Sequence, residues 1–292
     1  MSKGNQSKKH NFSESMFSIT ARRLFKNKAA VLGLCILIIE VVLAILAPYI
    51  SKYAYDAIDP LHKFMKPCAE HWFGTDNLGR DLFSRVLYGA RYSLAIGVSA
   101  TLLGTLVGMI IGGIAGYFGG TTDLILMRFL DVITSIPSML LTIIIVAVMG
   151  TGVVPTLCAL AVGGIAGAAR MFRAQCLAIR NQEYVEACRS IGCSHFSILL
   201  KHITPNAISP LIVSTTLGMA SAVTTCAGLS FIGLGVQMPI PEWGALLSAG
   251  RSYLRQYAYL SIFPGLAIML TVFSLNMLGD GLRDALDPKL KN

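Results

Sequence analysis

The stretch from Arg170 to Asn206 reads RMFRAQCLAIRNQEYVEACRSIGCSHFSILLKHITPN and separates two strongly apolar parts of the chain. It carries five arginine and lysine residues against two glutamates. Charged side chains are costly to place in the hydrocarbon core of a bilayer. We therefore expect this stretch to lie outside the membrane, between helices that cross it.

The middle of this stretch predicts two short helices that meet at an angle. Glu186, Ala187 and Cys188 lie in a run of reasonable helix formers. Gly192 lets the chain turn where a side chain would clash, and Pro205 marks a helix boundary before the next apolar segment. Such a helix pair makes a compact protrusion that suits a groove on a partner protein. The alternative is a generic amphipathic linker between two membrane helices.

The overall composition is that of a protein with several membrane spans. Hydrophobic residues make up 54% of the chain and charged residues 13%, and the mean hydropathy is +0.65. Soluble domains contain about 25% charged residues. The net charge of +9 arises from basic residues beside apolar segments, a pattern typical of cytosolic loops rather than of a nucleic-acid-binding face. We therefore expect a lipid bilayer, and no nucleic acid, as the surroundings.

Six apolar segments are long enough to cross the membrane as helices. A basic segment precedes the first of them and places the N-terminus in the cytosol. Counting the spans then places the C-terminus and residues 170–206 inside, and residues 51–91 and 229–256 outside. The fold class is therefore an all-α membrane protein with both termini cytosolic. The predicted spans are residues 29–50, 95–117, 124–149, 153–169, 207–227 and 259–278.

Four glycines in the second span recur every four residues, at Gly104, Gly108, Gly112 and Gly116. This spacing places them on one face of a helix. Small residues on such a face let a second helix approach closely. We predict a structural role in helix packing. A nucleotide-binding loop is excluded, because no lysine followed by serine or threonine comes after the glycines.

The third span carries Arg128 and Asp131, three residues apart and able to pair. We predict a structural ion pair in preference to a proton relay. Pro137, in the same span, is expected to kink the helix. Glu40 lies in the middle of the first span, where a carboxylate costs roughly 2.5–3.5 kcal/mol on insertion scales. A packing or partner contact is the favoured interpretation of Glu40, and a direct transport role is the alternative.

Three further strings point to one family. HWFGTDNLGRDLFSRVLYGARYSL, residues 71–94, closely resembles the GTDxxGRDxxSRxxxGxRxSL signature of dipeptide, oligopeptide and nickel permeases. LSFIGLGVQMPIPEWG, residues 229–244, and GDGLRDALDP, residues 279–288, resemble the LSFxGLGxxxPxPEWG and GDxLRDxLDP patterns of the same family. The chain is thus similar, from residue 22 onward, to the second, C-type permease subunit of these ATP-binding-cassette importers.

Within this resemblance, residues 170–206 match the EAA loop, which reads E-A-A, three residues, G, nine residues, I-x-L-P. Glu186, Ala187, Cys188, Gly192 and Pro205 occupy the motif positions and would couple the pore to the ATPases. The sequence departs from the motif at three places. Cys188 replaces the third alanine, and His202 and Thr204 stand at the I and L positions. These departures affect the packing of the loop and the strength of coupling.

The resemblance implies the type I importer permease fold in the plasma membrane of a prokaryote. It also implies four kinds of partner: a second permease subunit that completes the pore, two cytosolic ATP-binding subunits, an extracytoplasmic solute-binding protein and the lipid bilayer. The implied domains are a cytosolic tail (1–28), the first span with an extracytoplasmic segment (29–91), a permease domain with the coupling loop (92–281) and a C-terminal tail (282–292).

The residues themselves support part of this assignment. The sequence contains no G-x-x-x-x-G-K-[ST] motif, so ATP and Mg²⁺ are expected on partner subunits, and no cofactor or metal is expected on this chain. Neither G-x-S-x-G nor H-E-x-x-H occurs, so an enzyme with its own catalytic site is disfavoured.

Two questions of function stay open at the level of sequence. Peptides are the favoured solute, and nickel or a nickel chelate is the alternative for the same machinery. A secondary transporter is a more distant alternative, and it would need several paired charges in the middle of the spans.

Overall fold

The computed structural model describes residues 16–286, with side chains from residue 20 onward. Parts of both predicted tails, residues 1–28 and 282–292, therefore lie outside the described residues. Within residues 16–286 every extended regular element is a helix, and a lone β-bridge joins Thr75 to Asp81. The prediction of an all-α membrane fold is confirmed.

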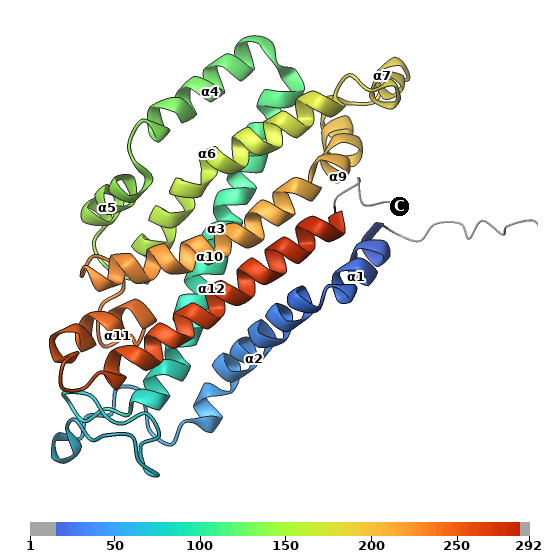
Figure 1. Cartoon of the computed structure of the whole chain (residues 1–292). Helices are drawn as coiled ribbons and strands as arrows, with labels where there is room; N and C mark the ends of the chain where they lie inside the picture. Colours follow the sequence, from blue (N-terminus) through green and yellow to red (C-terminus); the bar gives the residue numbers. More distant parts are fainter. Residues whose placement is uncertain (1–15, 287–292) are drawn as a thin grey trace, which may run out of the picture.

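Among the described residues, five helices are long and apolar enough to cross a membrane, and there are six candidate spans if a bent helix pair is counted as one. Figure 1 shows the long helices side by side, with α3 crossing behind the others. The bent pair, α4 and α5, turns by 82° at its break. The five long helices are α2 (Lys28–Ile50), α3 (Leu82–Phe118), α6 (Val153–Ile179), α10 (Ser209–Phe231) and α12 (Tyr259–Leu286); the bent pair is α4 (Gly120–Thr134) and α5 (Ser138–Met149).

Two helices extend beyond the predicted spans. Helix α3 begins at Leu82 instead of residue 95, so the expected separate amphipathic helix is its first turns. The carboxylate of Asp81 caps α3 by accepting a hydrogen bond from the Ser84 amide at 2.7 Å. Helix α6 likewise continues to Ile179, ten residues beyond the predicted end at 169, and carries Arg170 and Arg173 out of the span.

Pro137 has a stronger effect than the predicted kink. Helix α4 ends at Thr134, and α5 starts at Ser138, so the third span is broken into two helices rather than bent as one. Proline has no amide proton to continue the helix, and it restricts the backbone of the residue before it. These two effects together end α4 and allow the chain to restart in a new direction.

The four regularly spaced glycines of α3 lie against α6 of the same chain. A Cβ atom on Gly104, Gly108 or Gly112 would come within 2.6, 2.6 or 2.2 Å of a backbone carbonyl oxygen of α6. A Cβ atom on Gly116 would come within 2.8 Å of the Arg173 carbonyl oxygen. The two helix backbones therefore approach each other along the full ridge, and any side chain there would separate them.

The N-terminal helix α1 (Met16–Lys26) and α2 are joined at Asn27, whose side chain accepts hydrogen bonds from two amides of the first turn of α2. Helix α2 packs on α12, and Gly33 lies close to the Ser274 carbonyl oxygen. In the same contact, Thr271 donates a hydrogen bond to the Glu40 carboxylate at 2.8 Å. Glu40 is thus a contact between two helices of this chain.

Candidate functional site

The predicted two-helix protrusion follows directly from the end of α6. We call residues 180–207 the knob. Its first helix, α7 (Glu183–Ser190), projects beyond the bundle at the same end as α1 and the end of α12 (Figure 1). Its second half is a short α-helical turn, α8 (His195–Ser197), a π-helical turn (Ile198–Ile203) and α9 (Thr204–Ala207).

The inner side of the knob is anchored in the apolar core. Val185, Ile198 and Ile203 are each 0% exposed. His195 is also held, because its Nδ1 atom lies 2.8 Å from the hydroxyl of Tyr117 at the end of α3. The knob is therefore fixed to the ends of two spans. The buried residues of these spans that surround its anchors are Tyr117, Phe172, Cys176 and Ile179.

The outer side of the knob exposes two large apolar side chains to solvent. Ile191 is 78% exposed and Phe196 is 72% exposed, on either side of Gly192. Glu186 and Ala187 are exposed beside them. Contiguous exposed apolar residues with a polar rim mark protein-interaction sites. The sequence analysis missed Ile191 and Phe196, although two large apolar residues in a charged segment outside the membrane were a usable signal.

The other predicted residues of the loop have distinct surroundings. Gly192 has φ of +78°, and no atom lies within 4 Å of the position of a Cβ. Glycine is therefore required there by the backbone rather than by crowding. Cys188 is half-buried, and Pro205 is exposed in the first turn of α9, where a missing amide proton costs nothing.

The predicted Arg128–Asp131 pair is present but loose, with 3.9 Å between nitrogen and oxygen. A closer partner of Asp131 is Arg170 on α6, at 2.9 Å, which also donates to the Thr134 hydroxyl at 2.7 Å. Near the other end of α4, Asp123 accepts two hydrogen bonds from Arg173. Helix α4 is thus tied to α6 by contacts between residues far apart in sequence.

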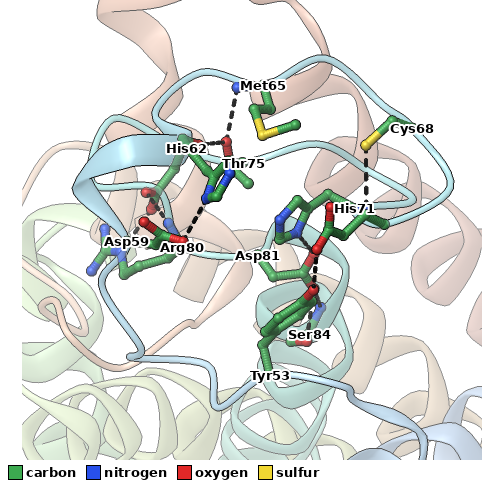
Figure 2. Close-up of polar contacts among 12 residues, drawn as sticks. Tyr53, Asp59, His62, Met65, Cys68, His71, Thr75, Arg80, Asp81 and Ser84 are labelled. Carbon is green, nitrogen blue, oxygen red and sulfur yellow. Dashed lines mark hydrogen bonds and ion pairs between the residues drawn. The ribbon is translucent and has the colours of Figure 1, made fainter.

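At the opposite end of the bundle, residues 51–81 form a segment that we call the cap (Figure 2). It contains one turn of 3₁₀-helix, Pro60–His62, and is otherwise irregular. Two glycines of the signature string allow this irregular backbone, since Gly74 and Gly79 have φ of +79° and +77°. A Cβ atom on Gly79 would lie 1.7 Å from the Asp59 carbonyl oxygen. These positions admit glycine alone.

The polar residues of the signature string bond to one another inside the cap. The Asp76 carboxylate accepts from Arg80 at 2.7 Å and from Arg85 at 3.2 Å. The carboxylate of Asp81 lies 2.9 Å from Nδ1 of His71 (Figure 2). All five side chains are buried. The string that resembles the permease signature therefore builds the cap and the start of α3.

A second acid–histidine contact lies at the surface of the cap. The Asp59 carboxylate lies 2.6 Å from Nδ1 of His62. This hydrogen bond lowers the pKa of Asp59 and raises the pKa of His62. Both shifts favour the charged pair at mildly acidic pH.

Two protein-family models match the chain. The model of the binding-protein-dependent transport system inner membrane component matches residues 92–292. The chain belongs to this family of permeases. A second model, the N-terminal transmembrane domain of oligopeptide transport permease C, matches residues 15–67. The two matches together cover the bundle, the knob and most of the cap.

Curated permeases are similar over nearly the whole chain. The dipeptide transport system permease protein DppC of Alkalihalophilus pseudofirmus is 41% identical over 93% of this chain and 89% of its own length. The oligopeptide transport system permease protein OppC of Bacillus subtilis is 41% identical over 95% of this chain and 91% of its own length. The glutathione transport system permease protein GsiD of Escherichia coli is 44% identical over 92% and 89%.

Solved structures of importer permeases share the fold. The MetNI methionine ABC transporter in inward-facing conformations aligns with a TM-score of 0.57 at 19% identity, covering 70% of this chain and 96% of that chain. An amino acid ABC transporter aligns with a TM-score of 0.51 at 19% identity, covering 68% and 92%. At this level of identity the likeness concerns the fold, which is that of type I importer permeases.

Proposed function

We propose that this permease forms half of a translocation pore for peptides in an ATP-binding-cassette importer. A second permease subunit completes the pore, two cytosolic subunits bind ATP and Mg²⁺, and an extracytoplasmic binding protein delivers the solute. Support for peptides comes from the similar relatives, whose names specify dipeptides, oligopeptides and glutathione. The membrane is the plasma membrane of a prokaryote, with the knob and both termini in the cytosol.

The observation that carries this proposal is the two-sided knob. Its inner side is buried against α3 and α6, and its outer side exposes Ile191 and Phe196. A partner that presses on the outer side can therefore move the spans without first distorting the knob. ATP-driven closure of the partner subunits shifts the pore between states only through contacts that differ between those states. The knob is where we place these contacts.

Each loop residue has a separate role in this proposal. Glu186 forms an ion pair with a basic residue of the ATPase or caps a helix there, and Ala187 permits close contact. Gly192 sets the angle between the two halves of the knob through its positive φ. Cys188 and Pro205 support the packing of the loop. Ile191 and Phe196 supply the apolar centre of the interface.

The proposal is tested by reconstituting this permease in proteoliposomes with ATPases, a second permease and a binding protein from the same organism. We expect ATP-dependent uptake of a radiolabelled dipeptide or oligopeptide. Uptake of a nickel chelate without any peptide uptake would refute the assignment of peptides. Solute uptake without ATP or an ATPase subunit would refute the importer mechanism itself.

A further inference from the structure

A groove of about 510 Å³ runs between α3, α5, α6 and α10. Its wall on α10 extends from Leu211 to Gly228. At 1.5 Å per residue this wall is about 25 Å long, close to the hydrocarbon thickness of about 30 Å. The groove therefore follows most of the path across the membrane.

The lining of the groove is uncharged and rich in hydroxyl groups, set among glycines and apolar side chains. Nine lining residues carry a hydroxyl group, five are glycine and none is Asp, Glu, Lys or Arg. The exposed face of α2 differs sharply, since it presents large aliphatic residues such as Leu32, Ile39 and Ile45. That aliphatic surface suits lipid tails, whereas the hydroxyl-lined groove suits water or a polar solute.

Several hydroxyl protons of the groove are directed into the helices, and the hydroxyl groups of Thr105 and Thr215 lie 3.3 Å apart. Thr101, Thr142, Thr215 and Thr225 each donate to the carbonyl oxygen four residues earlier, at 2.7–2.9 Å. A threonine hydroxyl has one proton and two lone pairs. Because the proton is used within the helix, the remaining capacity is that of an acceptor. The groove therefore offers uncharged hydrogen-bond acceptors.

The glycines of the groove differ from those of the α3 ridge. A Cβ atom added to Gly164, Gly167 or Gly228 would have no atom within 4 Å. A Cβ atom added to a glycine of the ridge would instead meet the backbone of α6. The groove glycines thus widen a space instead of closing a contact within this chain. A helix from another subunit could enter this space, but its backbone amides would already be bonded internally. An extended peptide has free backbone N–H groups, which can donate hydrogen bonds to the hydroxyl acceptors of the groove.

We propose that this groove binds the transported peptide through its backbone N–H groups, which donate to the threonine and serine hydroxyls. This inference rests on the proposed function and specifies which part of the solute the permease recognises. Every peptide carries backbone N–H groups whatever its sequence, and the groove has no charge that would select a particular side chain. The permease therefore tolerates varied sequences, and selection among peptides occurs before the groove.

Cysteine labelling tests whether solute occupies the groove. Ser214→Cys and Ser221→Cys place thiols in it, and Met219→Cys places one outside the groove, in a neighbouring apolar hollow. We expect a small charged thiosulfonate reagent to label the two groove positions, above the labelling of the unmodified chain, and to leave Met219→Cys unlabelled. Added peptide and binding protein should remove most of the groove labelling under turnover. Unlabelled groove thiols, or cross-links from them to the second permease, would show a filled helix interface and overturn the proposal.

Isosteric substitutions test the acceptor chemistry. Thr215→Val with Thr225→Val removes two acceptors without changing shape, and the matched control Thr216→Val alters the other face of the same helix. We expect peptide uptake per ATP hydrolysed to fall about three- to tenfold in the groove variant, and to be unchanged in the control. Wild-type uptake in the groove variant would overturn the inference while leaving the proposed function intact. Absence of peptide uptake by the parent complex would instead refute the proposed function. In that case, labelling of the groove thiols by the charged reagent would still show whether water fills the groove.

Discussion

The knob and the cap lie outside the spans at opposite ends of the bundle, and they are built in opposite ways (Figure 1). The cap is almost without helix, yet it buries Asp76 and Arg80 in a connected set of ion pairs that includes Arg85 of α3. The knob is mostly helical, is anchored by apolar side chains and leaves Ile191 and Phe196 in solvent. Irregular backbone is thus paired here with internal ion pairs, and regular helix with an apolar anchor, while both segments also expose large apolar side chains.

This difference separates a segment held by buried ion pairs from one held by buried apolar side chains. The cap also stacks its aromatic rings on the bundle, with 3.8 Å between the ring centroids of Phe73 and Phe263 of α12. Leu61 and Trp72 of the cap nevertheless stay 90% and 58% exposed, and the buried hydroxyl oxygen of Ser51 has no hydrogen-bond partner. The knob exposes Ile191 and Phe196 in a segment for which we propose an ATPase partner. We therefore expect changes in the cap to affect folding, and changes on the outer knob to affect assembly.

The contrast between the knob and the cap requires that the two segments face opposite sides of the membrane. In single-cysteine variants, we expect Cys68 of the cap to react with an impermeant maleimide in intact cells. Cys193 of the knob should react only after the membrane is permeabilised. Because Cys68 is exposed and Cys193 is half-buried, their labelling rates are not compared with each other. The labelling of each thiol is compared before and after permeabilisation. Labelling of Cys193 in intact cells would overturn the six-span topology.

The largest effect on stability is expected from the buried charges of the cap. Asp76→Asn removes the carboxylate that faces Arg85, whose side chain is 0% exposed. Breaking a buried ion pair costs about 3–5 kcal/mol, because the remaining charge is uncompensated. We expect a much lower aggregation temperature in detergent.

The matched control for the cap is Glu70→Gln. Glu70 is an exposed acid of the same segment, and its hydrogen bond from Tyr53 is 3.4 Å long. We expect its aggregation temperature to stay at the value of the parent protein. Equal losses in the two variants, or none in Asp76→Asn, would contradict the view that the cap is held by its internal charges.

An intermediate effect is expected at Gly192, where the backbone and not the space requires glycine. Alanine in the left-handed region costs about 1–2 kcal/mol, whereas asparagine is several-fold enriched there. Gly192→Ala should therefore weaken co-purification of the ATPase subunits more than Gly192→Asn does, although asparagine is larger. The opposite order would show that side-chain volume, and not the turn, matters at this position.

The smallest effect concerns the exposed Asp59–His62 contact. The raised pKa of His62 gives stability that is present below its ordinary value of 6.5 and is lost as pH rises through the folded pKa. The lowered pKa of Asp59 gives stability that is present above 3.8 and is lost as pH falls through the folded pKa. Asp59→Asn should thus lower the melting temperature slightly between pH 3.8 and 6.5, and less at pH 8. A difference that grows with pH would contradict this sign.

The sequence predicted what depends on local spacing. The length of apolar segments predicted the spans, the four-residue repeat predicted the glycine face of α3, and Gly192 predicted the turn of the knob. It could not identify Arg170 as the closer partner of Asp131, since 39 residues separate the two. It also did not show that the helix of the second span begins at Leu82, because the Asp76 carboxylate that pairs with Arg85 becomes visible only in the folded cap.

The hydroxyl-lined groove was out of reach for a related reason. Its walls come from four helices, and no single helix shows the pattern by itself. Ile191 and Phe196 were missed because apolar residues are expected to be buried, and only the structure reveals that the inner face of the knob is already filled.

The central claim is that the knob passes ATP-driven motion to the pore, and charge reversal at the two ends of the molecule tests it most directly. The comparison uses Glu186→Arg on the outer knob and Glu70→Arg on the cap, both at exposed positions, together with Gly192→Trp. The measurements are co-purification of the ATPase subunits and peptide-stimulated ATP hydrolysis in proteoliposomes. The account predicts that both knob variants insert normally but lose stimulated ATP hydrolysis by about tenfold or more, the size expected for a central interface residue. It predicts that Glu70→Arg keeps ATPase binding at the parent level. Parent values of both measurements in Glu186→Arg and Gly192→Trp would contradict it.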